Sequence, residues 1–171
     1  EAKITSPWNV ETNGKTLSTR SIIVATGAHP FVPHIKGIEK VGYLTSNNLW
    51  CIRELPKRLI ILGGGPIGCE LSQAFARLDS QVTQIEILSR IMIKEDNEIS
   101  SLLTKKFNDE GIDILTNHVA KEIVIESNKK KLICEKQSET IEIEFDYILI
   151  AVGRTANSSG FGLEELGLKL N

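Results

Sequence analysis

The chain has 171 residues with a formal net charge of −2; 41% of its residues are hydrophobic and 25% are charged. This composition is typical of a globular protein with one domain, or with one domain and a small second unit. The near-neutral charge argues against a nucleic-acid partner, and no apolar run reaches the roughly 20 residues of a membrane-spanning helix. We therefore expect a cytoplasmic protein with small-molecule partners and no membrane or nucleic-acid contacts.

The first 45 residues predict β structure that belongs to one domain. The Asn13-Gly14 step predicts a hairpin turn between extended segments. The apolar run at 22–25 predicts a strand that is covered on both faces. Residues 46–56 show no sustained period and predict a linker with one helical turn.

A glycine-rich turn between a strand and a helix opens the central part of the chain. The apolar run at 59–62 predicts a buried strand, and the glycines of residues 63–68 follow it at once. Apolar residues then recur at helical spacing as far as a helix end expected at Asp79. The predicted buried face of this helix consists of Ile67, Leu71, Ala74, Phe75 and Leu78.

The rest of the central unit predicts a strand at 81–87, a helix that follows the N-cap residue Asp96, and a strand at 112–115 after Gly111. This alternation predicts a parallel βαβαβ sheet joined by right-handed crossovers. Residues 119–146 alternate between apolar and polar side chains and predict an antiparallel meander. The helix after Asp96 is expected to bury Ile99, Leu102, Leu103 and Phe107.

Two similar segments flank this central unit. Residues 22–27 and 148–153 share a pattern of four apolar residues, one variable residue and a glycine. The sequence starts at Glu1 rather than Met, so we expect a piece of a longer protein that leaves one domain, forms another over 57–150 and returns over 151–171. The predicted fold class is α/β: a Rossmann-type βαβαβ parallel sheet with an antiparallel β meander, flanked by β segments of a second domain.

Gly63, Gly65 and Gly68 form a GxGxxG motif between a predicted strand and a predicted helix, which is the context that the motif requires. The first glycine permits a tight turn, the second lets the backbone approach a pyrophosphate, and the third lets the helix pack closely on the strand. Pro66 suits the first helical turn, where its missing N–H costs nothing. With Ile67 it is expected to line a dinucleotide site at the helix N-terminus. The alternative is a glycine-rich turn without a ligand.

Glu86 ends the second predicted strand, 18 residues after Gly68 and close to the spacing of about 20 residues expected for a ribose-binding acid. A carboxylate there accepts hydrogen bonds from the ribose hydroxyls and repels a 2′-phosphate, so it favours NAD over NADP. Arg90 lies near enough to weaken that preference. The alternative for Glu86 is a solvated charge at the end of a strand.

The three cysteines, Cys51, Cys69 and Cys134, form no CxxC or CxxxxC pair. Their spacing predicts neither a zinc site nor a local redox disulfide. Buried free thiols in a reducing cytosol are the simpler interpretation. We therefore expect no metal site in this chain.

Taken in order, Ala25–Gly27, Gly63–Glu70 and Ala151–Arg154 resemble the flavoprotein pyridine nucleotide-disulfide oxidoreductases, and most closely the dihydrolipoamide dehydrogenase and mercuric reductase-like members. The resemblance covers nearly the whole chain. It implies FAD on one domain and NAD(P)H on another, with a hydride passing to the flavin and electrons then passing to a disulfide or a metal. Residues 1–45 and 151–171 would belong to the FAD domain, and residues 57–150 would form the NAD domain.

The same resemblance implies roles for further residues. Thr26 and Gly27 would lie near the FAD. Glu70 would be an acid beside the nicotinamide, where it pairs with a lysine of the FAD domain; from the sequence alone, it could equally be an exposed helix residue. Val119 would lie against the adenine side, and Gly153 would let the backbone pass close to the cofactor.

The chain also departs from the family pattern. It lacks a second GxGxxG motif for FAD, the CxxxxC redox pair, and the C-terminal segment with a His-Glu pair and the dimer interface. Pro66 replaces an aromatic residue that often gates the nicotinamide pocket, and Ala156 replaces a proline. We therefore expect the chain to bind NADH, to hold no catalytic residue, and to depend on the rest of a homodimeric, FAD-containing protein for turnover.

Two functions remain open at this point. One is the NAD-binding part of a flavin-dependent oxidoreductase whose final electron acceptor the residues do not identify. The other is a regulatory module that senses NAD without chemistry. The segments at 22–27 and 148–153 favour the enzyme, because a stand-alone sensor has no need to pass through a second domain.

Overall fold

The computed structural model describes residues 1–169, which form two compact units. Unit 1 consists of residues 1–29 and the described residues from Arg154 onward, and unit 2 consists of residues 30–153. The larger unit therefore lies between two segments of the smaller one in sequence. None of the helices in residues 1–169 is long and apolar enough to cross a membrane.

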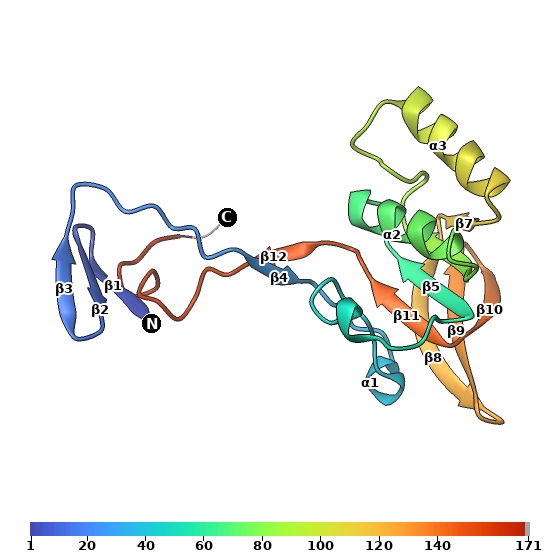
Figure 1. Cartoon of the computed structure of the whole chain (residues 1–171), viewed down its shortest axis with the longest axis horizontal. Helices are drawn as coiled ribbons and strands as arrows, with labels where there is room; N and C mark the ends of the chain where they lie inside the picture. The colour runs from blue at the N-terminus through green and yellow to red at the C-terminus, as the bar shows by residue number, and fades with distance from the viewer. Residues whose placement is uncertain (170–171) are drawn as a thin grey trace. The chain divides into compact units, whose positions relative to one another are not determined.

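Unit 2 is built around a four-stranded parallel sheet in the order β11–β5–β6–β7. Two helices cover one face of this sheet, and an antiparallel three-stranded meander covers the other (Figure 1). The predicted βαβαβ order and the predicted meander are confirmed. The strands of the sheet are β5 (Arg58–Leu62), β6 (Gln81–Glu86), β7 (Asp113–Thr116) and β11 (Tyr147–Ile150), the helices are α2 (Pro66–Ala76) and α3 (Asn97–Asp109), and the meander is β8 (Val119–Glu126), β9 (Lys129–Lys136) and β10 (Glu139–Phe145).

Alternate residues of the parallel strands enter two separate cores. Ile60 and Leu62 of β5 pack toward the meander with Phe145. Leu59 and Ile61, which point the other way, pack toward the helices. A strand that is buried on both faces must be apolar at every position, which explains the continuous run at 59–62.

The boundary of unit 2 differs from the sequence-based domain limits of 57 and 150. Residues 30–45, which we assigned to the other domain, contribute Ile35, Ile38 and Leu44 to the cores of unit 2. Leu44 also exchanges backbone hydrogen bonds with β11. The expected linker contains the 3-10 helix η1 (Leu49–Cys51) and is anchored by the buried side chain of Leu49, while the short helix α1 (Ile38–Val41) was not predicted. These residues pack through contacts distant in sequence, which a local pattern does not reveal.

The predicted buried face of α2 is wrong in part. Phe75 is buried and Leu71 packs against the same core, but Ile67, Ala74 and Leu78 are exposed. The residues that face the sheet are instead small, and they let the helix lie close to β5 and β6. Together with Phe75, the buried residues of this helix are Gly68, Cys69 and Ser72.

The predicted buried face of α3 is also only partly correct. Phe107 is buried and Leu103 packs against the same core, but Ile99 and Leu102 are exposed. The first turns are held instead by Ser100, whose hydroxyl donates to the carbonyl of Ile91 at 2.6 Å. The helix is therefore rotated so that a hydroxyl, rather than its neighbouring apolar side chains, faces the protein.

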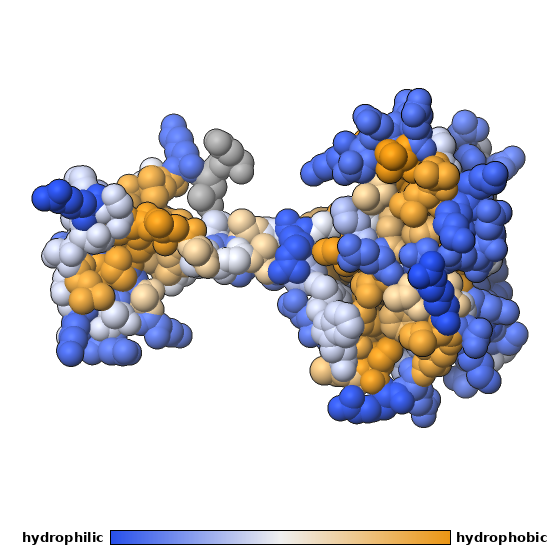
Figure 2. All heavy atoms as spheres, turned by 45° about the horizontal axis from the view of Figure 1, so that its top comes forward, coloured by the Kyte–Doolittle hydropathy of each residue, from blue (hydrophilic) through white to orange (hydrophobic). Residues whose placement is uncertain are grey.

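Unit 1 contains the antiparallel sheet of β1 (Ala2–Ser6), β2 (Asn9–Thr12) and β3 (Lys15–Ser18). It also contains β12 (Arg154–Ala156), which pairs with β4 (Ala28–Pro30), a short strand whose last residue is the first of unit 2. The predicted Asn13-Gly14 turn is confirmed, since both residues have positive φ. The predicted covered strand at 22–25 is wrong, because Ile23 is 90% exposed and no strand among residues 1–169 pairs with this segment. Backbone groups form a strand only with a partner, so Ile23 and Val24 stay exposed. Figure 2 shows hydrophobic surface on the smaller unit.

Glu110, just after α3, links the ends of the two helices. Its carboxylate accepts hydrogen bonds from Gln73 of α2 and from Arg77, the C-cap of that helix, and it forms an ion pair with Lys106. The hydrogen bond from Arg77, above all, lowers the pKa of Glu110 from 4.5 to about 2. The folded state therefore favours the ionised carboxylate.

We expect this network to contribute stability that is complete above pH 4.5 and is lost as the pH falls toward about 2. Glu110→Gln should flatten the pH dependence of the free energy of unfolding in that window, measured by urea denaturation at several pH values. Glu54→Gln, at an exposed glutamate outside the network, is the control. An unchanged pH dependence in Glu110→Gln would contradict the linkage.

Candidate functional site

The glycine-rich turn leaves the carboxyl end of β5 and enters α2. Gly63 has φ +114, and a Cβ built on it would lie 2.4 Å from the carbonyl oxygen of Ala151. Its N–H donates to Ile85 of β6 at 2.8 Å. This position therefore requires glycine both for its backbone conformation and for its contact with the chain that follows β11.

Gly68 and Gly65 have opposite surroundings. A Cβ on Gly68 would lie 2.2 Å from the carbonyl oxygen of Gly63, so the helix crosses the turn in direct backbone contact. A Cβ on Gly65 would meet no atom of residues 1–169 within 4 Å, apart from those of its two neighbours in sequence. Gly65 is the N-cap of α2, no side chain caps this helix end, and Pro66 occupies its first turn. The backbone of the turn is thus closely packed at Gly63 and Gly68, whereas the space around Gly65 is open.

Glu86 lies beside this open surface and is not the solvated strand-end charge that was the alternative. It is only 9% exposed. One carboxylate oxygen accepts the N–H of Gly64 at 2.5 Å, and the other accepts the N–H of Leu88 at 2.8 Å. Two backbone donors therefore fix the carboxylate next to the glycine turn before any ligand is present.

Two other predicted site residues, Val119 and Gly153, lie around the same edge of the sheet. His118 donates its backbone N–H to the carbonyl of Glu86 at 3.1 Å, which places Val119, the first residue of β8, beside the end of β6. Ala151 donates to Leu62 at 2.8 Å, and the exposed Gly153 follows two residues later. The turn, Glu86, Val119 and Gly153 are thus brought to the carboxyl end of one parallel sheet.

Ile67 and Glu70 lie on the first turns of α2. Both are exposed, so neither belongs to the face that packs on the sheet. The structure places Glu70 one helical turn after the open N-terminus of α2, within unit 2.

Thr26 and Gly27 belong to unit 1 and are held by Asn157. The Asn157 side chain donates to the carbonyl of Thr26 at 2.9 Å, and its backbone N–H donates to Gly27 at 3.0 Å. The Thr26 hydroxyl donates in return to the carbonyl of Asn157. His29 completes the cluster through a 2.7 Å hydrogen bond with the Asn157 side chain. The two family-like segments of this unit are therefore joined by one asparagine.

Gln84 is a site residue that sequence reasoning missed. It is fully buried, and its side-chain amide donates to the carbonyl of Gly63 at 3.0 Å and to the sulfur of Cys69 at 3.5 Å. The Gln84 amide thus holds the glycine turn through the carbonyl of Gly63. The available signal was an uncharged polar residue in a strand predicted to lie within the sheet, two residues before Glu86.

Cys69 and Cys134 are confirmed as buried free cysteines, whereas the prediction of burial is wrong for Cys51, which is exposed. For Cys69, the small buried residue that we expected replaces a redox role. Its thiol lies 3.5 Å from the carbonyl of Gly64. Burial raises the pKa of this thiol, so it stays protonated near neutral pH. No group of three or more His, Cys, Asp or Glu side chains in residues 1–169 is arranged to hold a metal ion.

The candidate site thus combines two features of one α/β unit: a helix N-terminus lined by glycines, and a buried acid at the end of the next strand. The family model of the pyridine nucleotide-disulphide oxidoreductases matches residues 1–171, and the chain belongs to this family.

The chain is 34% identical over 169 residues to a mercuric reductase of Lysinibacillus sphaericus, covering 99% of this chain and 31% of the relative. It is 36% identical over 172 residues to a dihydrolipoyl dehydrogenase of Acholeplasma laidlawii, covering 98% and 49%. Among solved structures, the HOCl-induced flavoprotein disulfide reductase RclA from Escherichia coli superposes with a TM-score of 0.83 at 31% identity, over 100% of this chain and 39% of that one. The chain thus spans between about a third and a half of the length of these proteins.

Proposed function

We propose that unit 2 binds NADH and presents it for hydride transfer to FAD within a longer flavin-dependent oxidoreductase. The observation that carries this proposal is the pairing of the open backbone at Gly65 with the buried carboxylate of Glu86 at one edge of the sheet. Membership of the pyridine nucleotide-disulphide oxidoreductase family favours this function over the NAD-sensing module.

The turn fits the pyrophosphate of a dinucleotide. The space above Gly65 admits the phosphates against the backbone, and the N-terminus of α2 directs its positive dipole end at them. Pro66 and Ile67 line this helix end. Gly63 and Gly68 act indirectly by letting the turn and the helix pack tightly enough to leave the space open.

Glu86 fits the ribose of the adenosine half. An ionised carboxylate has about four acceptor positions, and the N–H groups of Gly64 and Leu88 use two of them. The remaining positions can accept the two ribose hydroxyls, whereas a 2′-phosphate would bring negative charge against a buried anion. This supports a preference for NADH over NADPH, with Val119 on the adenine side.

We expect Glu86→Gln to lower the affinity for NADH by about tenfold or more, because a hydrogen bond to a charged acceptor contributes about 1.5–3 kcal/mol. Affinity for NADPH should fall less or should rise. Calorimetric titration of the wild-type and variant chains with both nucleotides measures the ratio. The proposed role of Glu86 is wrong if the wild-type chain binds NADPH as tightly as NADH, or if the ratio does not change in the variant.

The remaining residues concern the reactive end of the cofactor. When bound, NADH supplies the hydride. Glu70, on the first turns of α2, would orient the carboxamide of the nicotinamide, and the backbone at Gly153 would pass close to the cofactor. Thr26 and Gly27, joined by Asn157, would form part of the FAD side in unit 1.

The 171-residue chain itself is proposed to bind NADH without retaining FAD, because its sequence has only one GxGxxG motif and that motif lies in unit 2. In the longer protein, the proposed partners are the FAD and dimerisation parts of its own chain and a second copy in a homodimer. The proposed final acceptor is a disulfide or a metal ion. Among the relatives, the name mercuric reductase refers to a metal ion, and the name dihydrolipoyl dehydrogenase refers to a dithiol.

A further inference from the structure

We infer that Arg90 is a positioning residue of the nucleotide site, which clasps the loop at 91–95 and thereby holds Gly64 and Glu86 in place. It does so without serving as an anchor for a 2′-phosphate. This inference rests on the proposed function of unit 2 and assigns a further residue to the same site.

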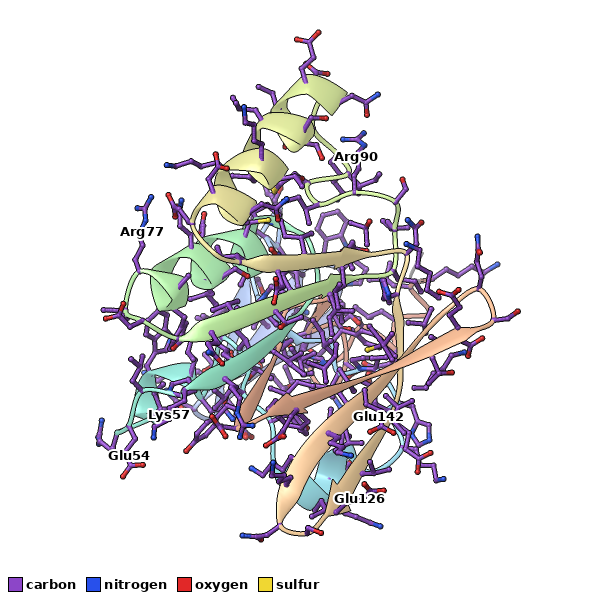
Figure 3. The ribbon with its side chains drawn as sticks, turned by 90° about the vertical axis from the view of Figure 1, so that its right-hand side faces the viewer. Glu54, Lys57, Arg77, Arg90, Glu126 and Glu142 are labelled. Atoms are coloured by element: carbon purple, nitrogen blue, oxygen red, sulfur yellow. The ribbon has the colours of Figure 1, made fainter. Side chains whose placement is uncertain are left out.

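The guanidinium of Arg90 is committed to the carbonyls of its own loop. One terminal nitrogen donates to the carbonyls of Glu95 at 2.8 Å and Met92 at 3.4 Å, and the other donates to Ile93 at 3.0 Å. Figure 3 shows Arg90 at the loop that leads into α3, away from Arg77, which follows the last residue of α2. A planar guanidinium offers several fixed donors at once, which suits a set of converging carbonyls.

The clasped loop is attached directly to the glycine turn. The N–H of Met92 donates to the carbonyl of Gly64 at 2.6 Å. Ile91 is fully buried, and its side chain lies 3.0 Å from the position of a Cβ on Gly64. Gly64 therefore contacts this loop on one side and the carboxylate of Glu86 on the other.

Met92 explains why the loop needs the clasp. Its φ is +49, a left-handed conformation that is unfavourable for a residue with a side chain. This conformation directs the Met92 N–H toward Gly64 and its carbonyl toward Arg90. Without the guanidinium, the carbonyls of the loop lose their common donor and the loop can relax away from Gly64. The hydrogen bond between Gly64 and Glu86 then loses its support.

The same commitment bears on cofactor choice. An arginine near the end of β6 could pair with a 2′-phosphate, as the sequence allowed. To do so here, Arg90 would have to leave three carbonyls, and the approaching phosphate would still face the buried carboxylate of Glu86. Removing Arg90 should therefore weaken NADH binding rather than selectively abolish NADPH binding.

The test compares Arg90→Gln, Arg90→Lys and the control Arg77→Gln in the 171-residue chain. We expect Arg90→Gln to bind NADH about tenfold more weakly, since charge-assisted hydrogen bonds are lost. Arg90→Lys should recover part of the affinity, because an ammonium can reach the carbonyls but cannot match the fork. Arg77→Gln removes a different arginine ion pair and should lower the thermal midpoint without changing NADH affinity.

Amide hydrogen exchange separates positioning from general destabilisation. In Arg90→Gln, exchange should accelerate at Met92 and Gly64 while the amides of β5 and α2 keep their protection. If wild type binds NADH and Arg90→Gln binds it equally well, or loses only NADPH binding, the inference is wrong and the proposed function stands. If wild type binds neither nucleotide, the proposed function fails and the inference fails with it.

Discussion

Gly65→Val is expected to lower the affinity for NADH by about 100-fold or more, equivalent to roughly 2.7 kcal/mol, while the chain stays folded. Gly65 has an ordinary extended backbone, with φ −79 and ψ 179, and apart from its two neighbours in sequence nothing in residues 1–169 lies within 4 Å of an added Cβ. A valine is therefore accommodated by the protein itself. Its side chain fills the space in which the pyrophosphate would meet the backbone.

Calorimetric titration with NADH and thermal unfolding followed by circular dichroism would measure both halves of this prediction. Asp96→Val is the matched control, because it places the same side chain at the N-cap of α3, where the native side chain also makes no capping hydrogen bond. A valine at an N-cap costs about 1 kcal/mol of stability. The assignment of the phosphate site fails if Gly65→Val binds NADH like wild type, or if its affinity falls only as much as that of Asp96→Val.

In contrast to Gly65→Val, Gly63→Ala is expected to act on stability. It should destabilise unit 2 by about 4 kcal/mol or more, among the largest effects of a single substitution. The added Cβ would lie 2.4 Å from the carbonyl oxygen of Ala151 and 2.7 Å from its carbonyl carbon, and φ is +114. Both contacts are with backbone, so no side chain can rotate to relieve them. Either the end of β5 or the segment after β11 must move.

Urea denaturation of unit 2 would measure this loss of stability. Gly111→Ala is the matched control, because Gly111 also has positive φ, at +79, but has open space around a Cβ. It should cost only the conformational term of about 1–2 kcal/mol. Equal destabilisation by the two substitutions would show that the contact with Ala151 does not matter.

The order of elements in unit 2 could be predicted because its signals are local. Residues such as Asp79 and Gly111, which end helices with positive φ, are recognisable from residue type alone. The rotation of a helix about its axis is not local. It depends on what the helix meets, and the tight contact of Gly68 with Gly63 turned Ile67 and Leu78 outward.

The candidate site likewise has a part that the sequence predicts and a part that depends on the fold. The glycines and Glu86 were recognisable because their chemistry follows from residue type and spacing. The burial of Glu86, the support that Gln84 gives to the turn and the commitment of Arg90 to its loop all depend on the folded backbone. The strand expected at 22–25 failed for a related reason, since an apolar run becomes a strand only beside a partner.

The insertion of unit 2 between the two segments of unit 1 has a consequence for the order of folding. The first segment, up to His29, cannot meet Arg154 and the residues after it until all of unit 2 has been synthesised. Closing so long an open loop is entropically costly. Unit 2 removes most of that cost when it folds, because its own ends meet: the N–H of Phe31 donates to the carbonyl of Gly153 at 3.0 Å. Folding of unit 2 therefore brings the two segments of unit 1 together, and slow or failed folding of unit 2 leaves β4 without its partner β12.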